Sequence, residues 1–212
     1  MLAVVTRLNL TLAVKRLVRD AAARLPELGH VRPAAVLVVA GEARRASRAT
    51  ISPAGGPVRK GAPARPTIRV KGRTILYVIT LRPLWFVAST PEERIATVLH
   101  ELYHASKRFD GTLHRGRRHA NYPRAAFDRK VRGLLRRYLA AAPPEIVAPF
   151  GASGTARARM WLERPSSARA NGTPPRRLYT EEQLFYGPVK IVTPDPPRPP
   201  SARAGSRRAR PS

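Results

Sequence analysis

The stretch "TPEERIATVLHELYHAS", residues 90 to 106, predicts a helix that packs by one side and presents histidines on another. Its start signals are complete, because Thr90 suits the cap, Pro91 the first helical position and Glu93 the end of a Thr-x-x-Glu capping box. An apolar stripe at i, i+3, i+4, i+7 spacing follows, made of Ile95, Val98, Leu99 and Leu102. We expect the helix to run to about Lys107 and to break at the following "FDG".

The same helix carries the pattern His-Glu-x-x-His at residues 100 to 104. His100 and His104 lie four residues apart, so they project from one side, and both imidazoles can reach one ion at about 2.0–2.1 Å. Glu101 lies one step around the helix, where it suits contact with a water molecule better than metal coordination. The chain has no cysteine, which leaves His, Asp and Glu as ligands. The pattern predicts a zinc site of the zincin type.

The third zinc ligand must come from outside the motif, since a catalytic zinc has three protein ligands and one open position. No glutamate follows Glu101 until Glu145, which disfavours a ligand from a downstream glutamate. We favour His119, because the fifteen residues from His104 allow the chain to finish the helix, turn and return. His114 stays open as an alternative ligand, as a contact to substrate or oxyanion, or as an ordinary loop histidine.

Outside the motif helix the sequence favours an α+β fold, a minimal zincin-like domain in which a small sheet packs on the motif helix with flanking helices. Apolar spacing and turn signals predict helices over 10–25 and 123–142, a buried strand over 34–41, and a hairpin of 67–70 with 74–80. Residues 42–66 are basic and rich in Pro and Gly, which predicts an irregular connection.

Composition divides the chain into three parts. Residues 1–140 hold the apolar, periodic segments and are expected to form the catalytic domain. Residues 141–193 form a C-terminal extension with short strand and helix elements. Residues 194–212, dominated by Pro and Arg, cannot bury a core and are expected to be a disordered basic tail.

The net charge of +27 comes from 40 Lys and Arg against 13 Asp and Glu. Such a field would attract nucleic acid to the basic surface and tail, but an excess of Arg in a chain rich in Ala and Pro also fits a GC-rich coding bias. Both interpretations stay open. No segment approaches the roughly 20 apolar residues of a membrane span, so we expect a soluble, cytoplasmic protein without a membrane partner. The oligomeric state is not indicated.

The segment "TPEERIATVLHELYHASKRFDGTLHRGRRHANYPRAAFDRKVRGLL" resembles the metallopeptidases found in phages and bacterial genomes, in which His-Glu-x-x-His is followed by a turn and another His. It is similar, more loosely, to SprT-like proteases, although this chain lacks their cysteine zinc ribbon. The resemblance implies that one zinc ion is bound by His100, His104 and His119. Glu101 would then be the general base in hydrolysis of a peptide or protein substrate.

Further roles are expected around this centre. Tyr122, which closely follows His119, would be a candidate for stabilising the oxyanion, as would His114. The strand "ILYVITL", residues 75–81, would hold an extended peptide by pairing along its edge. The alternative function is a nucleic-acid-associated protein, either a SprT-like protease acting on DNA-bound proteins or a binding module without catalysis.

Overall fold

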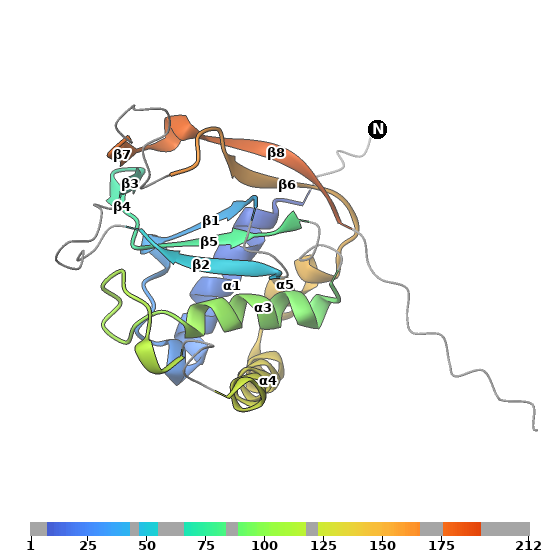
Figure 1. The fold of residues 1–212 in the computed structure, drawn as a ribbon. Helices are drawn as coiled ribbons and strands as arrows, with labels where there is room; N and C mark the ends of the chain where they lie inside the picture. The colour runs from blue at the N-terminus through green and yellow to red at the C-terminus, as the bar shows by residue number, and fades with distance from the viewer. Residues whose placement is uncertain are drawn as a thin grey trace, which may run out of the picture.

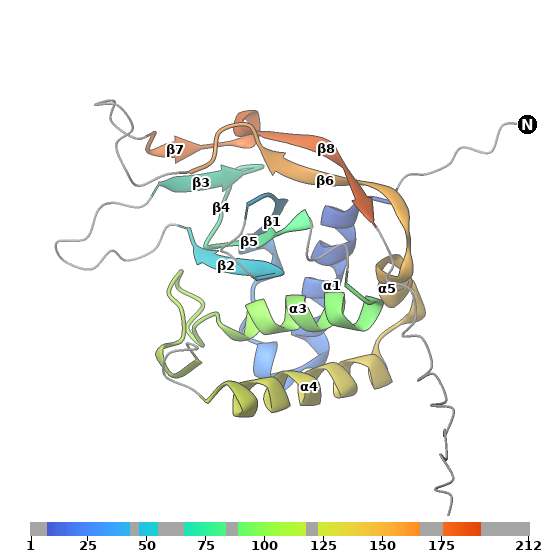
Figure 2. The ribbon, with the colours of Figure 1, turned by 45° about the vertical axis from the view of Figure 1, so that its right-hand side comes forward.

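A five-stranded sheet carries three long helices on one face and a three-stranded sheet on part of the other (Figure 1, Figure 2). The computed structural model describes residues 8–42, 47–54, 66–83, 89–117, 123–165 and 176–191. The helices are α1 (Leu10–Arg24), α3 (Pro91–Tyr103), α4 (Arg124–Ala141) and the short α5 (Pro144–Val147). The strands are β1 (Val36–Ala40), β2 (Ala49–Pro53), β3 (Thr67–Val70), β4 (Arg73–Thr74), β5 (Tyr77–Leu81), β6 (Gly154–Trp161), β7 (Leu178–Tyr179) and β8 (Leu184–Ile191). The α+β class is confirmed.

The larger sheet has the order β2-β5-β1-β6-β8, and the smaller one the order β4-β3-β7. β1 pairs in parallel with β5 along its whole length, and with β6 where Ala40 lies opposite Met160. β2 runs antiparallel to β5, and β8 runs antiparallel to β6. β2 and β8 are therefore the two edges of the larger sheet.

Alternation along β1 divides the core between the two faces of this sheet. Val36, Val38 and Ala40 pack with the helices, whereas Leu37 and Val39 pack on the opposite face with residues of the smaller sheet. Because both faces are covered, β1 is buried along its whole length. This burial explains why its sequence is a continuous apolar run, and it confirms the strand predicted there.

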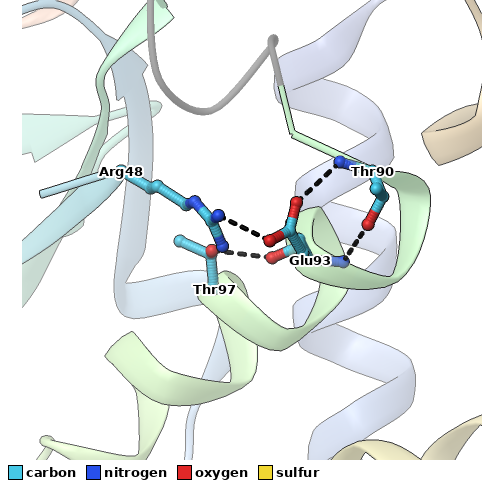
Figure 3. Close-up of polar contacts among 4 residues, drawn as sticks. All are labelled: Arg48, Thr90, Glu93 and Thr97. Carbon is cyan, nitrogen blue, oxygen red and sulfur yellow. Dashed lines mark hydrogen bonds and ion pairs between the residues drawn. The ribbon is translucent and has the colours of Figure 1, made fainter. Parts of the chain in front are cut away.

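The first turn of α3 is held by contacts on two sides. These contacts determine how the helix is rotated and therefore where the motif residues further along it point. Thr90 and Glu93 form the predicted capping box, with N–H to oxygen distances of 2.9 and 3.2 Å (Figure 3). Arg48, just before β2, forms an ion pair with Glu93 at 2.6 Å. On the other side the guanidinium of Arg94, 1 % exposed, donates to the carbonyl of Phe150 at 2.6 Å.

Three predictions about the strands were wrong. β3 pairs with the two-residue β4 rather than with a long second arm, because β5 leaves to join the larger sheet. The stretch 42–66, expected to be irregular, contains β2. β5 lies between β2 and β1, so "ILYVITL" has no free edge on which to hold a peptide.

The remaining elements follow the sequence closely. α1 and α4 lie within the predicted ranges, and α3 ends at Tyr103, before the expected Lys107. β6 and β8 hydrogen-bond into the same sheet as β1, while the domain boundary placed at residue 140 stays a prediction. In the described ranges, every helix is too short or too polar to span a bilayer.

Candidate active site

Two histidine rings converge at the C-terminal end of α3. Nε2 of His100 lies 3.1 Å from Nε2 of His104. Two nitrogens bound to one tetrahedral zinc ion at about 2.0–2.1 Å would lie roughly 3.3–3.4 Å apart, so the spacing and the imidazole chemistry both fit a shared zinc ion. His104 occupies the C-cap, one residue beyond the helix, and is 9 % exposed. The end of α3 thus places the Nε2 atoms of both rings close together.

One aromatic ring of α4 backs both histidines. Phe127, which is 1 % exposed, stacks on His104 with 5.0 Å between ring centroids and 17° between ring planes. The same ring meets His100 edge-on, with 4.8 Å between centroids. Because Phe127 fills the space beside both imidazoles, it limits their rotation and keeps the two Nε2 atoms together.

The glutamate of the motif is buried at the edge of the larger sheet. Glu101 is 7 % exposed, and its Oε2 accepts the backbone N–H of Ile51 in β2 at 2.8 Å. Burial raises the pKa of Glu101 to about 8, and the hydrogen bond from Ile51 acts in the opposite direction. The carboxyl therefore keeps its proton to a higher pH than an exposed glutamate would.

A cleft of about 710 Å³ opens onto the motif. Its walls come from residues 47–49 at the start of β2, from α3, and from the first half of α4, and both His100 and Glu101 line it. Two ion pairs stand in these walls, one between Arg48 and Glu93 and one at 4.0 Å within α4. A molecule entering this cleft would meet His100 and Glu101 together.

A comparison with protein families matches the part of the chain that contains the motif. The family model described as "Putative phage metallopeptidase" matches residues 8–131, a span that contains α1, α3 and the start of α4. The chain belongs to the phage metallopeptidase family. The predicted resemblance is thereby confirmed. Comparisons with curated proteins and with solved structures give no match.

The chain turns back directly after His104. Oδ1 of Asp110 accepts hydrogen bonds from the Ser106 hydroxyl at 2.8 Å and from the Thr112 hydroxyl at 2.6 Å. The hydrogen bonds from Thr112 and Ser106 lower the pKa of Asp110 to about 2. After the turn, the N–H of His114 donates to the carbonyl of His104 at 2.9 Å. The chain therefore comes back to the end of α3 at His114.

His119 and Tyr122 lie outside the described residues, so their roles stay predictions. The residues on either side of them contact the motif helix. Arg117 donates to the carbonyl of Tyr103 at 3.0 Å, and its guanidinium lies 3.7 Å from the centre of the Tyr103 ring. Beyond residue 122, Phe127 packs on both motif histidines.

His114 has a different environment from the motif histidines. Burial first, and then the charges of Arg117 and Lys107, lower its pKa. Its Nδ1 is buried without a hydrogen-bond partner in the part of the chain that the structure describes. Within that part, no group of three or more His, Asp or Glu side chains could hold a metal ion. The choice between His119 and His114 as third ligand stays a prediction.

Sequence reasoning missed two groups of this candidate site. Ile51 lies in a stretch expected to be irregular, although Ala49 and Ile51 are buried and alternate with less buried neighbours, the pattern of a strand. Phe127 begins the buried stripe of α4, which continues with Val131 and Leu134 at helical spacing. The alternation in β2 and the helical spacing in α4 were both present in the sequence. Neither pattern indicates which distant residues Ile51 and Phe127 would contact in the folded protein.

Proposed function

We propose that this protein is a zinc-dependent peptidase whose metal ion is held by His100, His104 and His119. Glu101 acts as the general base. The observation that carries the proposal is the 3.1 Å approach of the two Nε2 atoms, next to a buried carboxyl and at the wall of a large cleft. Membership of a metallopeptidase family gives independent support.

A bound zinc ion supplies a Lewis acid that activates water and polarises the scissile carbonyl. Glu101 takes the proton of the attacking water and later delivers it to the leaving amine. The N–H of Ile51 holds Oε2 of Glu101, so the proton is exchanged at Oε1. A cation nearby would favour the carboxylate form of Glu101 and bring its pKa below the value of about 8 that burial produces.

The choice of His119 rests on the two ends of segment 118–122. Arg117 is bound to the last residue of α3, and Phe127 packs on His100 and His104. The described residues on both sides of that segment therefore contact the motif, and this supports a ligand from within it. His114 already directs its backbone N–H to His104, and its ring lies among Arg117 and Lys107, whose charges oppose a bound cation.

We expect the substrate to be an extended peptide that pairs with the start of β2 near Ala49, because the N–H of Ile51 is already bound to Glu101 and Pro53 has no N–H. This strand forms the edge of the larger sheet next to α3, and residues 47–49 at its start line the cleft. A peptide that pairs with a sheet edge gains main-chain hydrogen bonds irrespective of its sequence, and the pockets beside the edge then select side chains. Arg48 and Glu93, whose ion pair stands in the cleft wall, are placed to contribute to that selection.

The test is hydrolysis of a quenched fluorescent peptide library by the full chain purified with zinc. Glu101→Gln keeps the shape of the side chain and an acceptor for Ile51 but cannot take up a proton. We expect activity to fall by roughly 10²–10⁴-fold while zinc content is unchanged. Glu92→Gln, an exposed change on the same helix, is the matched control and should leave activity intact. Full activity in Glu101→Gln would refute the assignment of the base.

A further inference from the structure

The antiparallel ribbon of β6 and β8 presents one buried face and one exposed face. Ala156, Ala158, Val189 and Ile191 point into the helix-side core. The residues between them point to the opposite face and pair across the strands: Thr155 with Lys190, Arg157 with Pro188, and Arg159 with Tyr186. This ribbon follows the family match, which ends at residue 131, so the peptidase assignment does not explain it.

The exposed face of the ribbon gathers cations around an aromatic ring. The guanidinium carbons of Arg157 and Arg159 lie 5.6 and 5.3 Å from the centre of the Tyr186 ring. Arg159 also donates to the Tyr186 hydroxyl at 3.3 Å. Tyr186 is 39 % exposed, much for so large a side chain. The ring and the two guanidinium groups are thus held together at the surface.

These cations are not neutralised by carboxylates of the described chain. Within those residues, Arg157, Arg159 and Lys190 form no ion pair. Glu181, whose charge interacts with Arg159, accepts a hydrogen bond from the backbone N–H of Lys71. The positive charge of the ribbon is therefore available to an external anion.

Further positive charges outside the ribbon interact with it. Lys15 of α1 donates to the carbonyls of Pro33 and Val36 at 2.7 and 2.5 Å. Its pKa is lowered to about 8, first by burial and then by the charges of Arg159, Arg19 and Arg73. Repulsion among these groups costs stability in the free protein, and a bound polyanion would relieve it.

We propose that the exposed face of the β6–β8 ribbon binds single-stranded nucleic acid. Arg157, Arg159 and Lys190 contact phosphates, and a base stacks on Tyr186. Arg and Lys on a strand surface supply a path for the sugar–phosphate backbone, and an exposed aromatic ring supplies a platform that accepts any base. A duplex keeps its bases stacked inside and cannot use that platform, so single strands are favoured. An acidic peptide would satisfy the charges but not the ring.

The test is fluorescence anisotropy of the full chain with a labelled oligothymidylate of about 15 nucleotides, over a series of salt concentrations. Arg157→Ala combined with Arg159→Ala should weaken binding at least about 10-fold and lower the slope of log K against log salt by roughly 1.4, since two phosphate contacts are lost. Tyr186→Ala should weaken binding by about 10-fold and leave the salt slope unchanged.

The matched control is Arg132→Ala combined with Arg136→Ala, which removes the same charge from the exposed side of α4, away from the ribbon (Figure 2). We expect this pair to weaken binding less than about 3-fold, because only the long-range field is reduced. Equal losses from both arginine pairs would overturn the proposal. So would duplex DNA that binds as tightly as the single strand, or polyglutamate that competes as well as an unlabelled oligonucleotide. Thermal melting of each variant identifies any loss of binding caused by unfolding.

Discussion

The motif at the end of α3 gathers polar groups in the interior of the protein, whereas the ribbon of β6 and β8 gathers them at the surface. Glu101 and His104 are 7 % and 9 % exposed, and their positions depend on Ile51 and Phe127, which come from distant parts of the chain. On the ribbon, Tyr186 is 39 % exposed, and the cations beside it come from the neighbouring strand. In the buried site, the surrounding fold fixes the positions of the polar side chains. On the ribbon, the regular pleat of two paired strands is sufficient to bring the side chains together.

This difference separates two kinds of chemistry. Proton transfer and metal binding require atoms held to within a fraction of an ångström, which packing and buried hydrogen bonds provide. Attraction of a polyanion requires only unneutralised charge at the surface, and it is weakened by salt. Substitutions at the motif should therefore change stability and chemistry together, while substitutions on the ribbon should leave the fold intact.

The largest effect is expected from the third ligand. His119→Ala should reduce zinc affinity by more than the roughly 10–100-fold that loss of an outer-shell partner costs, because it removes a group bound to the metal. His114→Ala, the matched change in the same connection, should reduce zinc affinity much less. Competition with a zinc-binding dye measures both constants. The reverse ranking would transfer the ligand role to His114.

The next effect contrasts the buried and the exposed aromatic residue. Phe127→Ala should lower the free energy of unfolding by about 3–5 kcal/mol, since it opens a cavity beside both motif histidines. Tyr186→Ala should lower it by less than about 1 kcal/mol, because the ring is largely at the surface. Urea denaturation of the two variants provides the comparison. Similar losses of unfolding free energy in the two variants would mean that packing stabilises the ribbon as strongly as it stabilises the motif.

A smaller effect is expected at the start of α3. Thr90→Ala removes the oxygen that accepts the N–H of Glu93 and should lower the free energy of unfolding by about 1 kcal/mol. Thr155→Ala, an exposed threonine of the ribbon, should change it by no more than about 0.5 kcal/mol. A Thr90 variant as stable as the wild type would show that Arg48 and Arg94 fix the helix without the cap.

The smallest effect concerns the turn that follows the motif. The pKa of Asp110 is lowered from 3.8 to about 2 by hydrogen bonds from Thr112 and Ser106. A lowered pKa in the folded state means that this stabilisation is complete above about pH 4 and is lost as the pH falls toward 2. Because the carboxylate is close to solvent, Asp110→Asn should remove at most about 1 kcal/mol of that pH dependence. Denaturation curves from pH 2 to pH 6 would detect it, and parallel curves for the two proteins would contradict the assignment.

The sequence was most informative where local signals and periodicity act together. The capping box at Thr90 and the apolar stripe of α3 predicted the helix, and the continuous apolar run at 34–41 predicted β1. β2 was missed because the strand has only five residues, is weakly apolar and is flanked by Pro, Gly and Arg. Its position depends on pairing with β5, and such long-range pairing is not encoded in the local pattern.

The same limit applies to the site. The spacing of His100 and His104 was sufficient to predict that they meet, because helix geometry alone brings them together. The burial of Glu101 and its bond to Ile51 depend on how β2 packs against α3, which no local pattern contains. Phe127 was visible as an apolar residue of α4, but its contact with both histidines depends on how α4 packs against α3.

The most direct test of the central claim is the zinc content of the dialysed full chain, measured by inductively coupled plasma mass spectrometry. We predict about one zinc ion per wild-type chain, the same in Glu101→Gln, and little or none in His100→Ala. Circular dichroism of His100→Ala separates loss of the metal from loss of the fold. A wild-type protein that is purified without zinc and takes up none when zinc is added would contradict the claim that His100 and His104 form a metal site.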